Sequence, residues 1–344
     1  MRRDLLLLLL LLTLPACVTP SEEPEPVPVD GTTEDATFTS GDLDLVGTLR
    51  LPDRVEGATV PGVILVHGSG PNSRDSELNG QLNLPFGWRL PVFEEIAVAL
   101  QDAGFAVLAY DKRTCGSWAT CENDYPLPED ILADQFVTDA QAAGRWLADH
   151  EAVDGVTVIG HSQGGAFMPA ILAEEPVFVG GISLAGNWRP IDALLRYQLE
   201  FSVQRAEEAG LTPQQVDEIT ASLRQMVEDL EALRGGTFQG ISIGGSPTAF
   251  WQSWMDIGDA RPGLVAAETR PLRALFGDYD WNVPPDPEAG LWSDAGVPGV
   301  TLDCISHAMN CITNDDWQTL APGDIGRDVS PDVIDAIVGW LPAD

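Results

Sequence analysis

A serine flanked by glycines is the stretch of this chain best suited to chemistry. Gly160-His161-Ser162-Gln163-Gly164 stands between residues 156–159, a β-branched run that predicts a buried strand, and residues 165–173, which predict a helix. In such a turn the small residues let the chain reverse tightly, lift the Ser162 hydroxyl above the sheet and leave the Gln163 N–H free for an oxyanion. A strand-to-helix turn with an incidental serine has the same pattern, so the assignment depends on partners elsewhere in the chain.

A second glycine-rich turn lies upstream of the first. Residues 62–66 form a continuous apolar run, which is typical of a central parallel strand covered on both faces. The run ends in His67-Gly68-Ser69-Gly70-Pro71, where the glycines permit a tight backbone turn. A loop of this kind can be a simple turn, but its occurrence together with the serine turn favours a functional role.

The two turns together resemble those of α/β-hydrolases. Residues 158–165 are similar to the nucleophile elbow of that superfamily, and with residues 65–71 they resemble bacterial serine esterases close to dienelactone hydrolases and acyl-thioester hydrolases. The resemblance extends over residues 37–341. It implies an α/β fold with a doubly wound, mainly parallel sheet, and it implies that the N–H groups of Ser69 and Gln163 form an oxyanion hole.

The resemblance also indicates the acid that orients the base. In this family the acid follows the nucleophile in the chain and the histidine follows the acid. Residues 277–284 resemble the family's Gly-x-x-Asp-x-x-Val loop, an alignment that selects Asp280 and leaves Asp278 as the alternative. Asp111 precedes the nucleophile, so we interpret it as structural, in a stretch that braces the loops below the site.

The base follows from the small number of histidines. The chain has four of them: His67, His150, His161 and His307. The first belongs to the upstream turn, the second ends a predicted helix and the third is part of the serine turn. His307, in the loop after the predicted last core strand at 299–303, has the required order and place. A surface histidine is the alternative interpretation.

Composition excludes several classes of partner. The 344 residues carry a formal net charge of −35, and Lys112 is the only lysine. Such a surface repels nucleic acid and anionic membranes, so neither is an expected partner. The sequence has no Cys-x-x-Cys pair, no His-Glu-x-x-His and no glycine-rich phosphate loop, so we expect no cofactor and no metal. We expect a monomer that acts on a small-molecule ester.

The N-terminal residues predict export. Two arginines followed by the apolar run at 5–12 are typical of a signal peptide, which we place at residues 1–16. Residues 14–17 resemble a bacterial lipobox, which would make Cys17 the lipidated first residue of a protein anchored to the cell envelope, facing the periplasm or exterior. Plain secretion with Cys17 free is the alternative. Residues 17–36 are acidic and proline-rich, as in an extended tether, and 37–344 form the hydrolase domain.

A helical block interrupts the alternation of strands and helices at about residues 188–268. Residues 191–233 are strongly helical, with Thr212 as the N-cap of a helix that begins at Pro213. Such a block between two strands is where α/β-hydrolases insert a lid. The apolar side chains that follow could line an acyl pocket or fill the core between lid and body: Phe250, Trp251, Trp254 and Met255.

Four further cysteines predict two disulfides in an exported protein. Cys115 and Cys121 share the loop after the strand ending at 110, and Cys304 and Cys311 flank the loop that carries His307. In the implied fold several strands separate the two loops, so cross-pairs would exceed the roughly 7 Å between Cα atoms that a disulfide spans. We therefore expect Cys115–Cys121 and Cys304–Cys311, with four free thiols as the alternative.

These features predict a serine esterase. Ser162 would attack an ester carbonyl, His307 would take its proton and Asp280 would orient His307. A serine peptidase or amidase, or an acyl-thioesterase, would carry the same residues and differ only in lid and pocket. A non-catalytic binding lipoprotein on the same fold is a further alternative.

Overall fold

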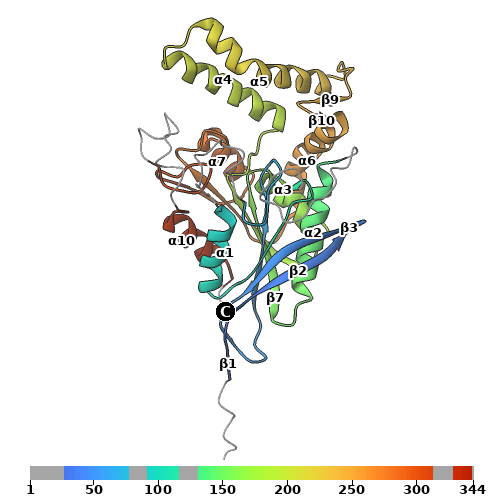
Figure 1. The fold of residues 1–344 in the computed structure, drawn as a ribbon, viewed down its shortest axis with the longest axis vertical. Helices are drawn as coiled ribbons and strands as arrows, with labels where there is room; N and C mark the ends of the chain where they lie inside the picture. The colour runs from blue at the N-terminus through green and yellow to red at the C-terminus, as the bar shows by residue number, and fades with distance from the viewer. Residues whose placement is uncertain (1–26, 77–90, 116–130, 313–327, 343–344) are drawn as a thin grey trace, which may run out of the picture.

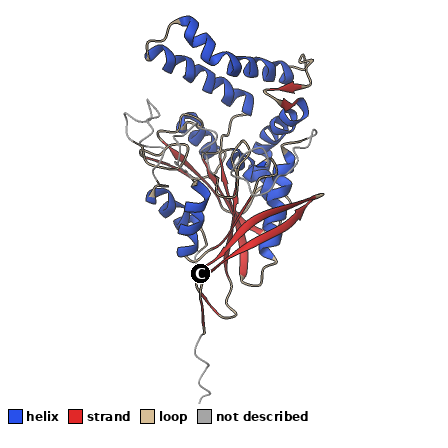
Figure 2. Cartoon of the chain, viewed as in Figure 1, coloured by secondary structure: helices blue, strands red, loops and turns tan. Residues whose placement is uncertain are grey.

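An eight-stranded sheet organises the molecule (Figures 1 and 2). The computed structural model describes residues 27–76, 91–115, 131–312 and 328–342. The strands lie in the order β12-β11-β8-β7-β5-β6-β3-β2. Their bounds are Thr32–Ser40 (β2), Leu43–Leu51 (β3), Val60–Val66 (β5), Ala106–Tyr110 (β6), Val153–His161 (β7), Phe178–Leu184 (β8), Leu272–Gly277 (β11) and Gly299–Leu302 (β12).

The sheet is mainly parallel, as expected. The six strands from β12 to β6 run parallel, and β3 and β2 add an antiparallel edge. All five residues of β6 and six of the seven in β5 and β8 are buried, because helices cover both faces of these strands. The α/β-hydrolase fold class is therefore confirmed.

Helices cover the sheet on both faces. On one face α1 (Val92–Asp102) and α10 (Pro331–Trp340) lie side by side, and α2 (Asp134–Ala148) and α3 (Gln163–Leu172) pack together on the other (Figure 1). The Ser330 side chain caps α10, since its hydroxyl accepts the Asp332 N–H. A further helix, α7 (Pro285–Asp294), packs beside β11 and β12 and has no counterpart in the prediction.

The inserted block consists of three long helices and one small hairpin. The helices are α4 (Ile191–Glu208), α5 (Pro213–Arg234) and α6 (Thr248–Ala267), and the hairpin pairs β9 (Ser242–Ile243) with β10 (Ser246–Pro247). Thr212 caps α5 in a capping box with Gln215, as predicted for its start. In Figure 1, α4 and α5 form a hairpin at the end of the molecule opposite β1, whereas α6 packs against α3.

The N-terminal boundary differs from the expected one. A short strand, β1 (Pro28–Val29), pairs with β4 (Arg54–Val55), and β2 then begins at Thr32 rather than at residue 37. The stretch 32–36 therefore belongs to the sheet and not to a tether. Each residue of β2, from Thr32 to Ser40, is paired with a residue of β3. These backbone hydrogen bonds hold the stretch in the sheet although its side chains are mostly polar.

Two expectations fall partly outside the described residues. The first is export, since the predicted signal peptide and Cys17 lie outside the described residues. The second is the Cys115–Cys121 disulfide, since Cys121 lies outside them as well. Within the described ranges, no helix combines the length and apolar character that a membrane span requires.

Candidate active site

Ser162 occupies a strained turn between β7 and α3. Its φ is 53°, a left-handed value that is unusual for serine and raises its side chain out of the strand-to-helix path. The flanking glycines are required because the backbones approach closely. A Cβ on Gly160 would lie 2.3 Å from the carbonyl carbon of Gly164, and a Cβ on Gly164 would lie 2.3 Å from the Val66 carbonyl oxygen.

Three predicted side chains meet at the carboxyl ends of the parallel strands. The hydroxyl of Ser162, after β7, lies 3.1 Å from Nε2 of His307. On the other side of the same ring, Nδ1 of His307 lies 2.7 Å from Oδ2 of Asp280. Because Asp280 follows β11 and His307 follows β12, three separate loops supply the hydrogen-bonded chain.

The loop after β11 directs the Asp280 carboxylate toward His307. Asp280 is 2% exposed, and its Oδ1 accepts the backbone N–H groups of Asn282 and Val283, each at 2.9 Å. These two bonds leave Oδ2 directed at His307. Asp278 is exposed to solvent instead.

The other early aspartate, Asp111, has the structural place expected for it. Both of its carboxylate oxygens accept from the Arg74 guanidinium, and Oδ1 also accepts the Arg74 backbone N–H at 2.8 Å. It therefore braces the loop that follows the upstream turn.

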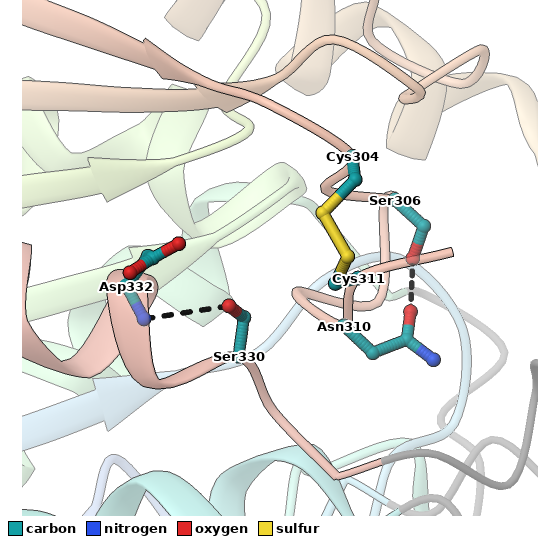
Figure 3. The surroundings of a disulfide bond; sticks show 6 residues. All are labelled: Cys304, Ser306, Asn310, Cys311, Ser330 and Asp332. Atoms are coloured by element: carbon teal, nitrogen blue, oxygen red, sulfur yellow. Dashed lines mark hydrogen bonds between the residues drawn. A yellow bond between two sulfur atoms is a disulfide. The ribbon is translucent and has the colours of Figure 1, made fainter. Parts of the chain in front are cut away.

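The loop that carries His307 is closed by a disulfide. Cys304 and Cys311 are bonded, as predicted, with their Cα atoms 4.8 Å apart (Figure 3). Figure 3 also shows the Ser306 hydroxyl bonded to the Asn310 side chain across the same loop. Cys115 is disulfide-bonded as well, and its expected partner lies outside the described residues.

His161, the last residue of β7, supports the loop that carries His307. Its Nε2 lies 2.7 Å from the His307 carbonyl oxygen, and the two rings are 4.8 Å apart. Burial, with the nearby His307, lowers the pKa of His161 to about 3. A neutral ring with its proton on Nε2 donates to that carbonyl, so His161 holds the backbone of His307 in place.

The upstream turn lies directly against the serine. A Cβ on Gly68 would be 3.2 Å from the Cβ of Ser162, which shows how closely the two loops approach. The Asn72 amide nitrogen donates to the carbonyls of Gly68, Ser69 and Gly70 at 3.0, 3.1 and 3.4 Å and so holds the turn in shape.

His67 is a structural part of this turn. Its Nε2 lies 2.5 Å from the Tyr110 carbonyl, and its ring stacks on Phe93 with 4.8 Å between centroids. Burial lowers its pKa to about 4, so the ring is neutral and is suited to donate to that carbonyl. The ring therefore ties the turn to the end of β6.

Helix α4 of the inserted block contacts the loop that carries Asp280. The Gln198 side chain on α4 donates to the Asn282 carbonyl at 2.8 Å. The Phe201 ring stacks on Trp281 with 6.1 Å between centroids and 9° between planes. Helix α4 thus reaches the residues that immediately follow Asp280.

The predicted aromatic set lies in the core. The four side chains are 1–9% exposed: Phe250, Trp251, Trp254 and Met255. The three rings pack on one another, and Trp254 packs edge-on against Phe167 of α3. This packing favours the filling of space between α6 and the body over an open acyl pocket.

Two positions beside the serine were not singled out from the sequence. The sequence pattern places His161 only within the serine turn, and it assigns Lys112 no role in the site. The only feature of the sequence that distinguishes Lys112 is that it is the one lysine in the chain. Among the described residues, no group of three or more His, Cys, Asp or Glu side chains is placed to hold a metal ion.

The fold agrees with what comparison with known proteins finds. The model of the alpha/beta hydrolase family matches residues 63–334, and the chain belongs to this family. Among curated proteins it is similar to esterase EstD of Thermotoga maritima, with 27% identity over 287 residues, which cover 82% of this chain. The match spans 62% of the length of EstD.

Two solved esterases share the fold at low sequence identity. Est1E from Butyrivibrio proteoclasticus is 15% identical with a TM-score of 0.50, and the match covers 85% of this chain and 96% of that one. Esterase Pf2001 from Pyrococcus furiosus is 16% identical with a TM-score of 0.51, covering 87% and 92%.

Proposed function

We propose that this protein is a carboxylic ester hydrolase in which Ser162, His307 and Asp280 form a catalytic triad. The observation that carries the proposal is the continuous chain of hydrogen bonds from the Ser162 hydroxyl through both ring nitrogens of His307 to Asp280. Nucleophile, base and orienting acid within hydrogen-bond reach are what acyl transfer through a serine requires. The similarity to EstD, which is named as an esterase, supports esters as the substrate class.

In the first half-reaction Ser162 attacks the ester carbonyl carbon while His307 Nε2 takes the hydroxyl proton. The Nδ1–H of His307 donates to Asp280, which keeps the imidazole in the tautomer whose Nε2 can accept. As the ring becomes cationic, the Asp280 carboxylate stabilises the charge. His307 then gives the proton to the departing alcohol, which leaves an acyl group on Ser162.

The carbonyl oxygen gains negative charge during the attack. In this proposal the backbone N–H groups of Ser69 and Gln163 bind it. Gln163 is the first residue of α3, so its N–H lies at the positive end of a helix, where an anion is favoured. The close approach of Gly68 to Ser162 brings the other loop to the same place. Water, activated by His307, then cleaves the acyl-enzyme through a second oxyanion.

The test is ester turnover by the purified protein and a Ser162→Ala variant. The variant should lose several orders of magnitude in kcat for p-nitrophenyl esters and remain folded by circular dichroism, because the three side chains act as a unit. The matched control is Ser202→Ala on α4, where the hydroxyl donates to the Gln198 carbonyl, and it should keep full activity. A fluorophosphonate should label the wild type at Ser162. Absence of turnover and of labelling would refute the proposal.

The same experiment separates the alternatives. We expect hydrolysis of p-nitrophenyl esters and not of peptide anilides. Preference for anilides would indicate a peptidase or amidase. A series of acyl esters from acetate to palmitate, and the matching thioesters, then defines the acyl group.

We also propose that the enzyme is exported and attached to the cell envelope through lipidated Cys17, and that it works as a monomer on a small-molecule ester. The support is the pattern of residues 1–17. The disulfide between Cys304 and Cys311 is compatible with an oxidising compartment.

A further inference from the structure

The one lysine of the chain is buried beside the candidate active site. The chain has 18 lysines and arginines together, and Lys112, which follows β6 and Asp111, is the sole lysine. It is 4% exposed. Burying an ammonium costs free energy unless strong partners surround it, so its contacts indicate why it is there.

The ammonium bridges two loops that flank Ser162. Its Nζ donates to the Gly68 carbonyl at 2.6 Å and to the side-chain oxygen of Gln163 at 2.7 Å. It also lies 4.3 Å from the centre of the Phe136 ring, a cation–π contact. Two oxygens and a ring face are suited to its three hydrogens. Within the described part of the chain, no carboxylate forms an ion pair with Lys112.

The contact with Gly68 controls the direction of one proposed oxyanion donor. The Gly68 carbonyl and the Ser69 N–H belong to the same peptide unit. In a planar trans peptide these two groups point in opposite directions, so a partner that fixes the carbonyl also fixes the N–H. The ammonium further polarises this peptide, which makes its N–H a stronger donor.

The contact with Gln163 acts on the other proposed donor. Gln163 supplies its backbone N–H to the oxyanion, and its side chain is 2% exposed. Lysine can only donate hydrogen bonds, so the amide oxygen, not the amide nitrogen, must face Lys112. The side chain is thereby locked, and with it the first residue of α3.

We propose that Lys112 is a positioning residue that holds both halves of the oxyanion hole in register, one through the Gly68–Ser69 peptide and the other through Gln163. The inference rests on the proposed function and adds to it a shared anchor behind the two donors. Ser69 and Gln163 lie far apart along the chain, so a common anchor helps to keep the distance between their N–H groups constant.

Several charged or titratable groups face this ammonium. They are Asp139 on α2, which is paired with Arg113, and His67, which directly follows β5. Asp111 precedes Lys112 in the chain and is paired with Arg74. Burial lowers the pKa of Lys112 to about 7, and the charge of Asp139 raises it in part. The cation is therefore present below pH 7 and is lost as the pH rises through that value.

Loss of the cation affects stability and activity in opposite directions. Between pH 7 and the ordinary lysine pKa of about 10.4, the unfolded chain binds more protons at this site than the folded one. The contribution of Lys112 to stability therefore rises with pH in that window. Its contribution to turnover falls, since a neutral amine makes weaker hydrogen bonds than an ammonium.

The test compares wild type, Lys112→Met and Lys112→Arg on p-nitrophenyl acetate from pH 6 to pH 9. Lys112→Met should lower kcat roughly 100-fold at pH 6 with KM changed less than about threefold, because the oxyanion exists only in the transition state. The ratio of wild-type to Met-variant kcat should shrink above pH 7, and taking the ratio removes any pH dependence that the two proteins share. Lys112→Arg should restore part of the lost kcat. The ratio of its kcat to that of Lys112→Met should stay constant to pH 9, because arginine keeps its charge over this range.

Arg145→Met is the matched control, since it removes a basic side chain from α2 that pairs with Glu175 away from the site. It should retain wild-type kcat. A kcat of Lys112→Met within threefold of the wild-type kcat would overturn the inference. The proposed function would still stand in that case, because the wild type turns over the ester. A lower kcat with the same ratio at every pH and no rescue by Arg would show a merely structural role. Wild type without turnover would instead refute the proposed function.

A second measurement needs no substitution. Because the chain contains one lysine, isotope-labelled lysine gives a single side-chain NMR signal, which can be titrated directly. Reaction of Ser162 with a boronic acid places an anion in the oxyanion hole, and the titration midpoint of Lys112 should then rise by at least about half a unit. An unchanged midpoint after complete reaction would overturn the inference even if the Met variant fails to fold.

Discussion

Replacing Asp280 by asparagine isolates what its carboxylate does, because the structure dictates how the amide must lie. Oδ1 of Asp280 accepts two backbone N–H groups at 2.9 Å, from Asn282 and Val283. An asparagine keeps both bonds only if its oxygen takes that place. Its NH₂ group then takes the place of Oδ2, which lies 2.7 Å from Nδ1 of His307, and so faces that nitrogen.

An NH₂ group facing Nδ1 reverses the tautomer of His307. Nδ1 must then accept, so the ring proton moves to Nε2, the atom that should take the proton of Ser162. Turnover should fall roughly 10,000-fold in kcat, which corresponds to about 5.5 kcal/mol at the tenfold cost of 1.36 kcal/mol. The variant should remain folded, because the two backbone bonds and the volume of the side chain are preserved.

The assay is hydrolysis of p-nitrophenyl acetate under saturating substrate, with folding followed by circular dichroism. Asp278→Asn is the control in the same loop, and it should keep kcat within about twofold because Asp278 is exposed. A loss at Asp278 equal to that at Asp280, or an Asp280→Asn variant with more than a tenth of wild-type turnover, would refute the reasoning.

Other predictions concern the cysteines. Wild type should partition into detergent with membranes, and Cys17→Ser should leave the protein soluble or unprocessed; wild type found wholly soluble with Cys17 unmodified would exclude the anchor. Reduction of Cys304–Cys311 should lower the free energy of unfolding by about 2–3 kcal/mol, the value expected for so short a loop. The protein should stay folded, and its kcat should fall by a larger factor than this loss of stability explains. Equal turnover before and after reduction would exclude this effect. Non-reducing peptide mapping should recover Cys115 linked to Cys121 and not to Cys304.

The sequence was sufficient for features that depend on neighbouring residues. The strand at Phe178–Leu184 follows from its apolar run, and the start of α5 follows from Thr212 and the proline after it. The turn at Ser162 was equally visible, since only glycines fit where the Gly160 and Gly164 backbones approach so closely. Cys304 and Cys311 are seven residues apart, and their pairing likewise needed only the general topology.

Edges and short connections were less predictable. Residues 32–36 are polar and looked like a tether, but their backbone pairs with β3, and backbone hydrogen bonds leave no trace in composition. Helix α7 begins amid prolines at 284, 285 and 287, which mask a helical pattern in the sequence.

The sequence by itself determined which kinds of side chain were available and in what order. Tertiary structure alone decided how they meet: the direction of Asp280 Oδ2, the donation from His161 to the His307 carbonyl, and the bridge from Lys112. Gly68 and Lys112 are 44 residues apart, and Lys112 and Gln163 are 51 apart. Parallel strands bring their carboxyl ends to one edge whatever their separation along the chain, so contacts at that edge follow the order of strands in the sheet.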